Sequence, residues 1–173
     1  MSTANMVIGI GNEYRSDDGV GLRVLRASKE MPLSGTALIE CTNECIDLPE
    51  MWKTASSVIM IDAVSSGAQP GTIYRLDAFA QPIPTNLSFR STHSFGIAEM
   101  IELARILDQL PARLIVYAIE GKDFSMGTAL SPEVERSVQQ VVAQLTSEIQ
   151  GGHQYRNTAA NGPSSGMSAC STT

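Results

Sequence analysis

Two carboxylates and one imidazole in this chain occupy positions where metal chemistry is expected. Asp17 and Asp18 lie in a loop after one apolar segment, Asp62 ends another apolar segment, and His93 closes a long loop before a helical pattern. Carboxylate oxygens supply negative charge, and an imidazole favours nickel, zinc or copper over magnesium. Three protein ligands also leave coordination positions open. We therefore predict a transition-metal site formed by Asp17 or Asp18 together with Asp62 and His93.

Each of these residues also has a structural explanation. Asp17 or Asp18 would serve equally well as the N-cap of a helix that begins near Gly19 and as a partner for its dipole. A single aspartate at a strand end is often a turn residue, and a single histidine is more often structural than a ligand. Their occurrence together favours a site. Glu40 also ends a predicted strand and is a weaker candidate for the same cleft.

The elements that would position these side chains alternate along the chain. Short apolar segments predict strands at 6–10, 36–40, 58–62, 71–76 and 113–119. Helical patterns cover 19–29, 48–53, 94–107 and 131–149, the last with Ser131 as N-cap and Pro132 at the first helical position. This alternation predicts an α/β fold with a mostly parallel sheet and helices on both faces. In such a fold, ligands bind at the carboxyl ends of the strands.

Length and composition predict one domain. The 173 residues, 43% of them hydrophobic, suffice for one well-buried core and are too few for two. We expect the domain to span residues 1–150. Residues 151–173 are rich in Gly, Ser, Thr and Asn, so they are expected to form a disordered tail.

The charge balance argues against several classes of partner. The net charge is -6, and no cluster of basic and aromatic residues suggests nucleic-acid binding. The N-terminal segment lacks a basic leader, and no apolar run approaches the roughly 20 residues that cross a bilayer. We expect a soluble, cytoplasmic protein without membrane contact. Cys41, Cys45 and Cys170 are odd in number and are expected to be free thiols in a reducing compartment.

The glycines of "GIGNEYRSDDG" also invite a nucleotide-binding interpretation, which the residues disfavour. Tyr14 stands where the GxGxxG fingerprint needs its third glycine, and the chain has no GK[ST] sequence. The neighbouring acids would repel phosphates. No GxSxG nucleophile motif is present either, so covalent catalysis has little support.

Four sequence blocks, taken together, resemble the hydrogenase maturation endopeptidases. They are "GIGNEYRSDDGVG", "VIMIDAVSSGAQPGTIYRL", "STHSFGIAEMIELAR" and "LIVYAIEGKDFSMGTALSPEVERSV", and the similarity runs from about Met6 to Ile149. Enzymes of this family trim the C-terminal extension from the large-subunit precursor of nickel-iron hydrogenases. The resemblance implies a three-layer α/β sandwich with a twisted five-stranded sheet, a monomer, and a hydrolase classed with the aspartic-type endopeptidases.

The same resemblance implies roles for individual residues. Asp18, Asp62 and His93 match the family's catalytic and metal-binding residues. The implied ion is nickel already installed in the precursor, and in the free enzyme it is absent or replaced by another divalent metal. Activation of water stays open between Asp18 or Asp62 as general base and nickel as Lewis acid. The alternative function is a non-cleaving metal-dependent binding module or nickel chaperone for the precursor.

Residues around the first block carry further expectations. Gly9 and Gly11 either admit a substrate backbone or only shape a sharp turn, and Asn12 is expected to bind loop amides and hold Asp18 in place. After the second strand, "ECTNECIDLPEMW" departs from the glycine-rich "DGGT"-like segment of many relatives. That region is implied to select the cognate hydrogenase, so the identity of the precursor stays open. Participation of Cys41 or Cys45 stays open as well.

Overall fold

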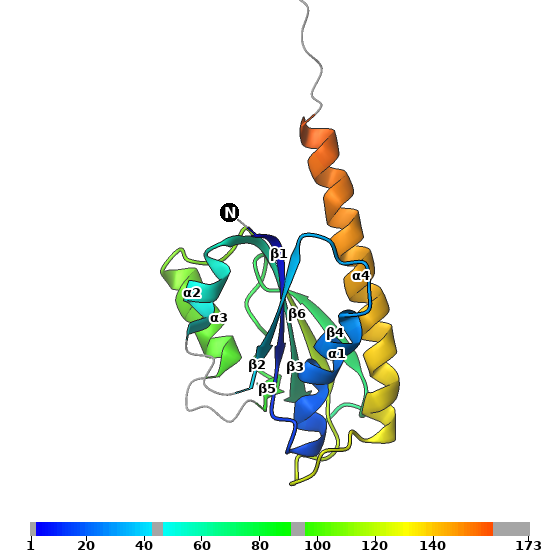
Figure 1. Ribbon diagram of the computed structural model, residues 1–173. Coiled ribbons are helices and arrows are strands. Elements are labelled where there is room, and N and C mark those ends of the chain that lie inside the picture. The colour runs from blue at the N-terminus through cyan, green and yellow to red at the C-terminus, as the bar shows by residue number, and fades with distance from the viewer. Residues whose placement is uncertain (1–2, 43–46, 91–95, 161–173) are drawn as a thin grey trace, which may run out of the picture.

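A central β-sheet carries helices on both faces (Figure 1). The computed structural model describes residues 3–42, 47–90 and 96–160. Four parallel strands lie in the order β2 (Thr36–Cys41), β1 (Thr3–Ile10), β3 (Ala55–Ser65) and β6 (Arg113–Glu120), and antiparallel β4 (Ile73–Asp77) follows β6 at the edge. The sixth strand, β5 (Ser88–Phe89), pairs with the end of β3. The predicted α/β class is confirmed. The sheet has one strand more than the five predicted, because β5 is too short to carry a periodic pattern.

Strand β3 forms the centre of the sheet and is buried on both faces. Every residue from Ser57 to Val64 is buried, and Asp62 is the one charged side chain in that run. A continuous apolar run is typical of a parallel strand covered by helices on both sides. Burying a carboxylate there costs free energy, which points to a role other than packing.

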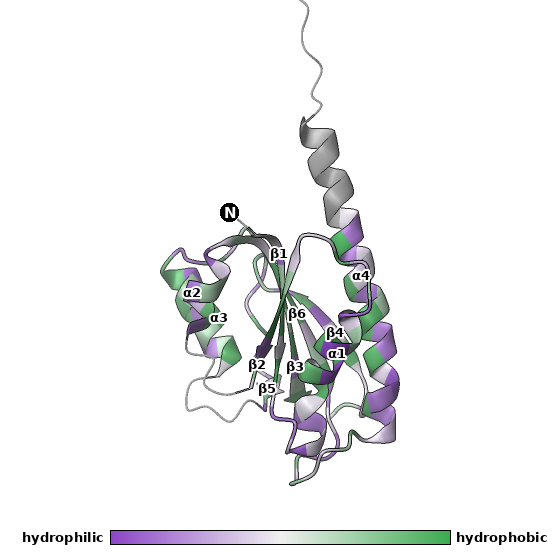
Figure 2. Cartoon of the chain, viewed as in Figure 1, coloured by the Kyte–Doolittle hydropathy of each residue, from purple (hydrophilic) through white to green (hydrophobic). Residues whose placement is uncertain are grey.

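The helices pack in pairs on the two faces of the sheet (Figure 1). Helices α1 (Val20–Ser28) and α4 (Pro132–Ala160) cover one face, and α2 (Leu48–Trp52) and α3 (Ile97–Ile106) cover the other. Figure 2 shows hydrophobic colour on the strands and purple patches on the outward side of α4. Each face therefore has its own apolar core. Members of the first include Val24, Leu25, Ile59, Tyr117 and Val141, and members of the second include Ile8, Trp52, Met60, Ile101 and Val116.

Helix α4 is longer than the sequence indicates. Its backbone continues through Ala160, past Gly151, where the predicted tail begins. Residues 161–173 lie outside the described residues, so the tail stays a prediction for that part of the chain. Across the described ranges, no helix combines the length and the apolar composition needed to cross a membrane.

A half-buried acid fastens α4 to the edge of the sheet. Glu148 accepts hydrogen bonds from Arg75 Nε at 2.5 Å and Tyr117 Oη at 2.6 Å, and it also pairs with Arg113. Burial, the largest single influence, raises the pKa of Glu148, but the hydrogen bonds and charges of the neighbouring residues outweigh it, so the pKa is lowered overall. Glu148 therefore stabilises the docked helix in its charged form.

We expect Glu148→Gln to lower the free energy of unfolding by about 2 kcal/mol at pH 7, because charge-assisted bonds to two arginines are lost. The folded state lowers the pKa of Glu148, so its contribution is present above the unfolded value of about 4.3 and is lost as the pH falls. Urea denaturation across the acid range measures this. A variant whose deficit stays constant as the pH is lowered would contradict the assigned role.

Candidate active site

The carboxyl ends of the four parallel strands meet at one edge of the sheet, the lower side in Figure 1. The chain leaves β1 there and forms the short 3-10 helix η1 (Ser16–Gly19), which contacts β3. Strand β1 pairs with β3 only as far as Gly9 and Ile61. Asp62 is therefore the first residue of β3 beyond the part that pairs with β1, where η1 can approach it.

Asp18 of η1 and Asp62 of β3 are brought together at this edge. Both are buried, with 1% and 0% of their surfaces exposed. Burial raises the pKa of Asp62 well above its ordinary value; the hydrogen bond from Ala63 N to Asp62 Oδ1, 2.8 Å, lowers it, and the charge of Asp18 raises it further. Two carboxylates so placed suit a divalent cation, which would offset both charges.

One buried oxygen atom of Asp62 supports the binding of a cation at this pair. Asp62 Oδ2 is buried and accepts no hydrogen bond from the part of the chain that the structure describes. A buried acceptor without a donor is costly, and a bound cation would satisfy it. The oxygen chemistry of the pair therefore fits a divalent metal ion.

His93 lies outside the described residues, so its part in the site stays a prediction. Within 3–42, 47–90 and 96–160, no three His, Cys, Asp or Glu side chains gather into a metal-binding group. The described chain before His93 nevertheless lies near the carboxylates, because Arg90 N donates to the carbonyl oxygen of Ala63 at 3.2 Å. Arg90, the last described residue before His93, thus lies beside the residue that follows Asp62.

The two adjacent aspartates have different tasks. Gly19 is the N-cap of α1, and neither it nor the residue that precedes η1 caps through a side chain, so the alternative in which Asp17 or Asp18 caps the helix is not observed. The carboxylate of Asp17 instead accepts four hydrogen bonds from residues 122, 123 and 131. Asp18 interacts with Asp62, and Asp17 holds a distant loop.

The glycines are required by packing and by the turn. A Cβ on Gly9 would lie 2.5 Å from the carbonyl oxygen of Gly21, so its place is taken by α1. Gly11 has a φ of +146°, and a Cβ there would lie 1.9 Å from the carbonyl oxygen of Asp18. The structure thus favours the structural explanation of both glycines over room for a substrate backbone. The side chain of Asn12 binds a loop amide as predicted, because its Oδ1 accepts from Tyr14 N at 2.9 Å. Its contact with Asp18 is made by the backbone, where Asn12 N donates to the Asp18 carbonyl oxygen at 3.2 Å.

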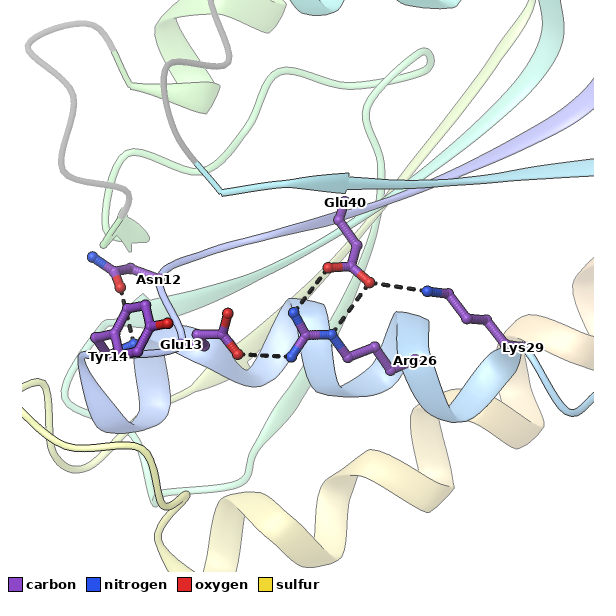
Figure 3. A network of polar contacts seen from close by, with 6 residues as sticks. All are labelled: Asn12, Glu13, Tyr14, Arg26, Lys29 and Glu40. Atoms are coloured by element: carbon purple, nitrogen blue, oxygen red, sulfur yellow. Dashed lines mark hydrogen bonds and ion pairs between the residues drawn. The ribbon is translucent and has the colours of Figure 1, made fainter.

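Glu40 belongs to a surface network rather than to the carboxylate pair. Figure 3 shows Arg26 of α1 between Glu13 and Glu40, with Lys29 also bound to Glu40. The hydrogen bonds from Arg26 and Lys29 lower the pKa of Glu40 to about 2. This network ties the turn after β1 to α1 and to the end of β2.

We expect Glu40→Gln to change stability by no more than about 1 kcal/mol, because its partners are solvated, and to leave any activity of the carboxylate pair within about twofold. Increasing salt should shrink the stability difference, because ions screen exposed pairs. Thermal unfolding at low and high salt, together with the activity assay described below, tests this. A large loss of activity without a loss of stability would instead show that Glu40 takes part in the active site.

Cys41 differs from the prediction of free thiols. It is disulfide-bonded in the structure. The prediction of three free thiols is therefore wrong, and Cys45 and Cys170 themselves lie outside the described residues.

The sequence of this chain matches the model of a known protein family. The family is described as hydrogenase maturation protease, and the match covers residues 34–148, which is more than half of the chain. The chain belongs to this family. The resemblance inferred from the four sequence blocks is thereby confirmed.

Individual hydrogenase maturation proteins agree with this membership. The hydrogenase expression/formation protein HupD of Thiocapsa roseopersicina is 26% identical over 136 residues, a match that covers 77% of this chain and 62% of that protein. The chain thus spans less than two thirds of that relative. Among solved structures, the [NiFe] hydrogenase maturation protease HybD from Thermococcus kodakarensis is 26% identical with a TM-score of 0.64, covering 82% of this chain and 96% of that one.

A further similarity bears on the fold alone. An endopeptidase from Escherichia coli, solved in solution, has a TM-score of 0.72 at 21% identity and covers 86% of this chain and 94% of its own. The architecture is therefore retained at an identity too low to carry residue roles.

One part of the chain was not assigned a role by the sequence. Residues 121–131, between β6 and α4, contact η1, yet none of them is a predicted site residue. The nearest signal is the pair Ser131-Pro132, which predicts a helix start. It does not reveal that the hydroxyl of Ser131 donates to Asp17 at 2.8 Å.

Proposed function

We propose that this protein is an endopeptidase that removes the C-terminal extension of a nickel-iron hydrogenase large-subunit precursor after nickel insertion. The observation that carries this proposal is the buried pair of Asp18 and Asp62 at the carboxyl edge of the sheet, in a chain of the hydrogenase maturation protease family. The large-subunit precursor as partner, the monomeric state and the aspartic-type classification belong to the same proposal.

The carboxylate pair supports recognition of the substrate's own metal. Two buried like charges repel each other, and a cation brought between them converts repulsion into attraction. A precursor that carries nickel would thus bind through Asp18 and Asp62, with His93 as the proposed third ligand, whereas a precursor without nickel would lack this attraction. Recognition that precedes an irreversible cut would restrict cleavage to the loaded precursor.

The same groups are candidates for the hydrolytic step. Peptide hydrolysis needs a base that takes a proton from the attacking water, and a carboxylate within reach of that water can do so. We propose Asp18 or Asp62 in this role, with polarisation of the scissile carbonyl by the substrate's nickel as the alternative source of activation.

The proposal is tested by incubating the purified protein with nickel-loaded and nickel-free large-subunit precursor and measuring the precursor's mass. We expect shortening of the loaded form only. Folded variants Asp18→Ala, Asp62→Ala and His93→Ala should leave the loaded precursor intact, and Glu40→Gln should cut it normally. Binding of the loaded precursor at unchanged mass would instead identify a non-cleaving binding module or nickel chaperone, and normal cutting by all three alanine variants would exclude the assigned site.

A further inference from the structure

The β6–α4 loop, residues 121–131, is bound to η1 by backbone hydrogen bonds. Ser16 N donates to the carbonyl oxygen of Gly127 at 2.8 Å, and Gly127 N donates to that of Tyr14 at 3.0 Å. Asp17 N donates to the carbonyl oxygen of Asp123 at 2.9 Å. The chain from Tyr14 to Asp17 is thus paired with a segment more than a hundred residues away in sequence, and this pairing includes Asp17, the residue before Asp18.

The side chain of Asp17 adds hydrogen bonds to this backbone pairing. It is fully buried. Its Oδ2 accepts from Lys122 N at 2.8 Å, Asp123 N at 2.9 Å and Ser131 Oγ at 2.8 Å, and its Oδ1 accepts from Ser131 N at 2.6 Å. Hydrogen bonds to an ionised acceptor are stronger than those between neutral groups. Both ends of the loop are therefore tied to one carboxylate of η1.

The backbone of η1 needs this support. Ser16 has a φ of +52°, in the left-handed region that is sterically unfavourable for residues other than glycine. Ser16 Oγ donates to the carbonyl oxygen of Ser125 at 3.1 Å, so the loop holds the residue by its side chain as well as by its N–H. A turn in such a conformation persists only when its surroundings impose it. Asp18 is two residues further on and takes its place from this turn.

The same loop also contacts the chain near Asp62. The carbonyl oxygen of Phe124 accepts a hydrogen bond from Arg15 Nη2 at 3.4 Å. The centroid of the Phe124 ring lies 4.7 Å from the guanidinium carbon of Arg90. Arg90 in turn is hydrogen bonded to Ala63, which donates to Asp62. The β6–α4 loop is therefore connected to both segments that supply a carboxylate.

We propose that Asp17 is a positioning residue: by binding the β6–α4 loop to η1, it fixes Asp18 relative to Asp62. This inference rests on the proposed function for its activity test. Asp17→Asn is the informative variant, because it keeps the size of the side chain but leaves one acceptor oxygen. Its NH2 group would face the N–H of Ser131 or those of Lys122 and Asp123, so the backbone hydrogen bonds at one end of the loop would be lost.

Glu148→Gln supplies a matched control. Glu148 is also a largely buried acid that joins distant elements, but it lies at the α4 edge among Arg75, Arg113 and Tyr117. Replacing it removes a comparable set of hydrogen bonds away from η1. A loss of activity that reflects lowered stability alone would occur in both variants, whereas a loss caused by misplacement of Asp18 would occur only in Asp17→Asn.

The first measurement is kcat/KM for a nickel-loaded large-subunit precursor. We expect a fall of about 10- to 100-fold for Asp17→Asn, the range typical of groups that orient metal ligands, with Glu148→Gln close to wild type. Ser131→Ala, which removes one of the four hydrogen bonds, should give a smaller fall. Binding of the nickel-free precursor should be unchanged in all three variants. Wild-type kinetics for Asp17→Asn, or an equal fall for Glu148→Gln, would overturn the proposal.

The second measurement is amide hydrogen exchange on the free protein, which needs no precursor. The N–H groups of Asn12 and Asp18 bond to the carbonyl oxygens of Asp18 and Arg15, so they report on the turn itself. We expect both to exchange faster in Asp17→Asn than in Glu148→Gln. Faster exchange confined to residues 122, 123 and 131 would show that Asp17 only anchors the loop, and would overturn the proposal. If wild-type protein fails to cut any precursor, the proposed function fails, and the exchange result still decides the positioning role.

Discussion

Replacing Asp62 by asparagine is expected to abolish processing and at the same time to stabilise the fold. The carboxylate is fully buried, and its pKa is raised by burial and by the charge of Asp18. An amide of the same size removes the charge that the core disfavours. Because the folded protein holds the pKa of Asp62 above its unfolded value, we expect Asp62→Asn to be more stable than wild type at pH 7. Processing should fall by about 100-fold or more, because an amide cannot replace the charge that attracts the precursor's nickel.

The pH dependence of stability gives the sign of this effect. In the folded protein the pKa of Asp62 lies above its unfolded value of about 3.9, so the folded state binds a proton that the unfolded chain releases. Stability conferred by that proton is present at low pH and declines as the pH rises through the folded pKa. Asp62→Asn should lack this decline, so its advantage over wild type should increase with pH.

Chemical denaturation from pH 4 to pH 8 measures the stability, and the mass-based assay measures processing. Asp108→Asn is the control, because Asp108 is exposed and has a φ of +55°, a conformation that asparagine also adopts. It should stay within about 0.5 kcal/mol of wild type and cut normally. An Asp62→Asn variant that is less stable than wild type at pH 8 would contradict the view that this carboxylate is retained for function at the expense of stability.

Adding one methyl group at Gly21 is expected to cause the largest loss of stability among the substitutions considered. A Cβ at this position would lie 2.3 Å from the carbonyl oxygens of both Ile10 and Ile61. These are backbone atoms of β1 and β3, so no side-chain rotation relieves the overlap. Helix α1 would have to move away from the sheet, and we expect Gly21→Ala to lower the free energy of unfolding by about 3 kcal/mol. Because η1 leads directly into α1, processing should fall as well.

Gly151→Ala is the matched control. Gly151 lies in α4, and a Cβ there would contact nothing within 4 Å. In a helix, alanine is favoured over glycine by about 0.8–1.0 kcal/mol, so this variant should be no less stable than wild type. Urea denaturation of both proteins decides the matter: similar stabilities for Gly21→Ala and wild type would show that the helix does not need to lie this close to the strands.

The sequence by itself determined the α/β class and placed one of the adjacent aspartates, Asp17 or Asp18, at the same edge of the sheet as Asp62. Apolar segments and helical spacing are local properties, so they predict which residues form strands and helices. The rule that parallel strands end at one edge then brings the two aspartates together. The structure bears this out, and it shows why Asp62 is accessible to η1: β1 stops pairing with β3 at Ile61.

Only the tertiary structure decided what the neighbouring polar residues do. Sequence pattern could not separate Asp17 from Asp18, since both are adjacent acids at a helix start, and it could not place Glu40 beside Arg26 and Lys29. The partners of Asp17 lie more than a hundred positions away. Hydrophobic periodicity indicates whether a side chain is buried. The role of a buried or half-buried acid, however, depends on which groups donate hydrogen bonds to it. Those donors are known only once distant loops have been brought into contact.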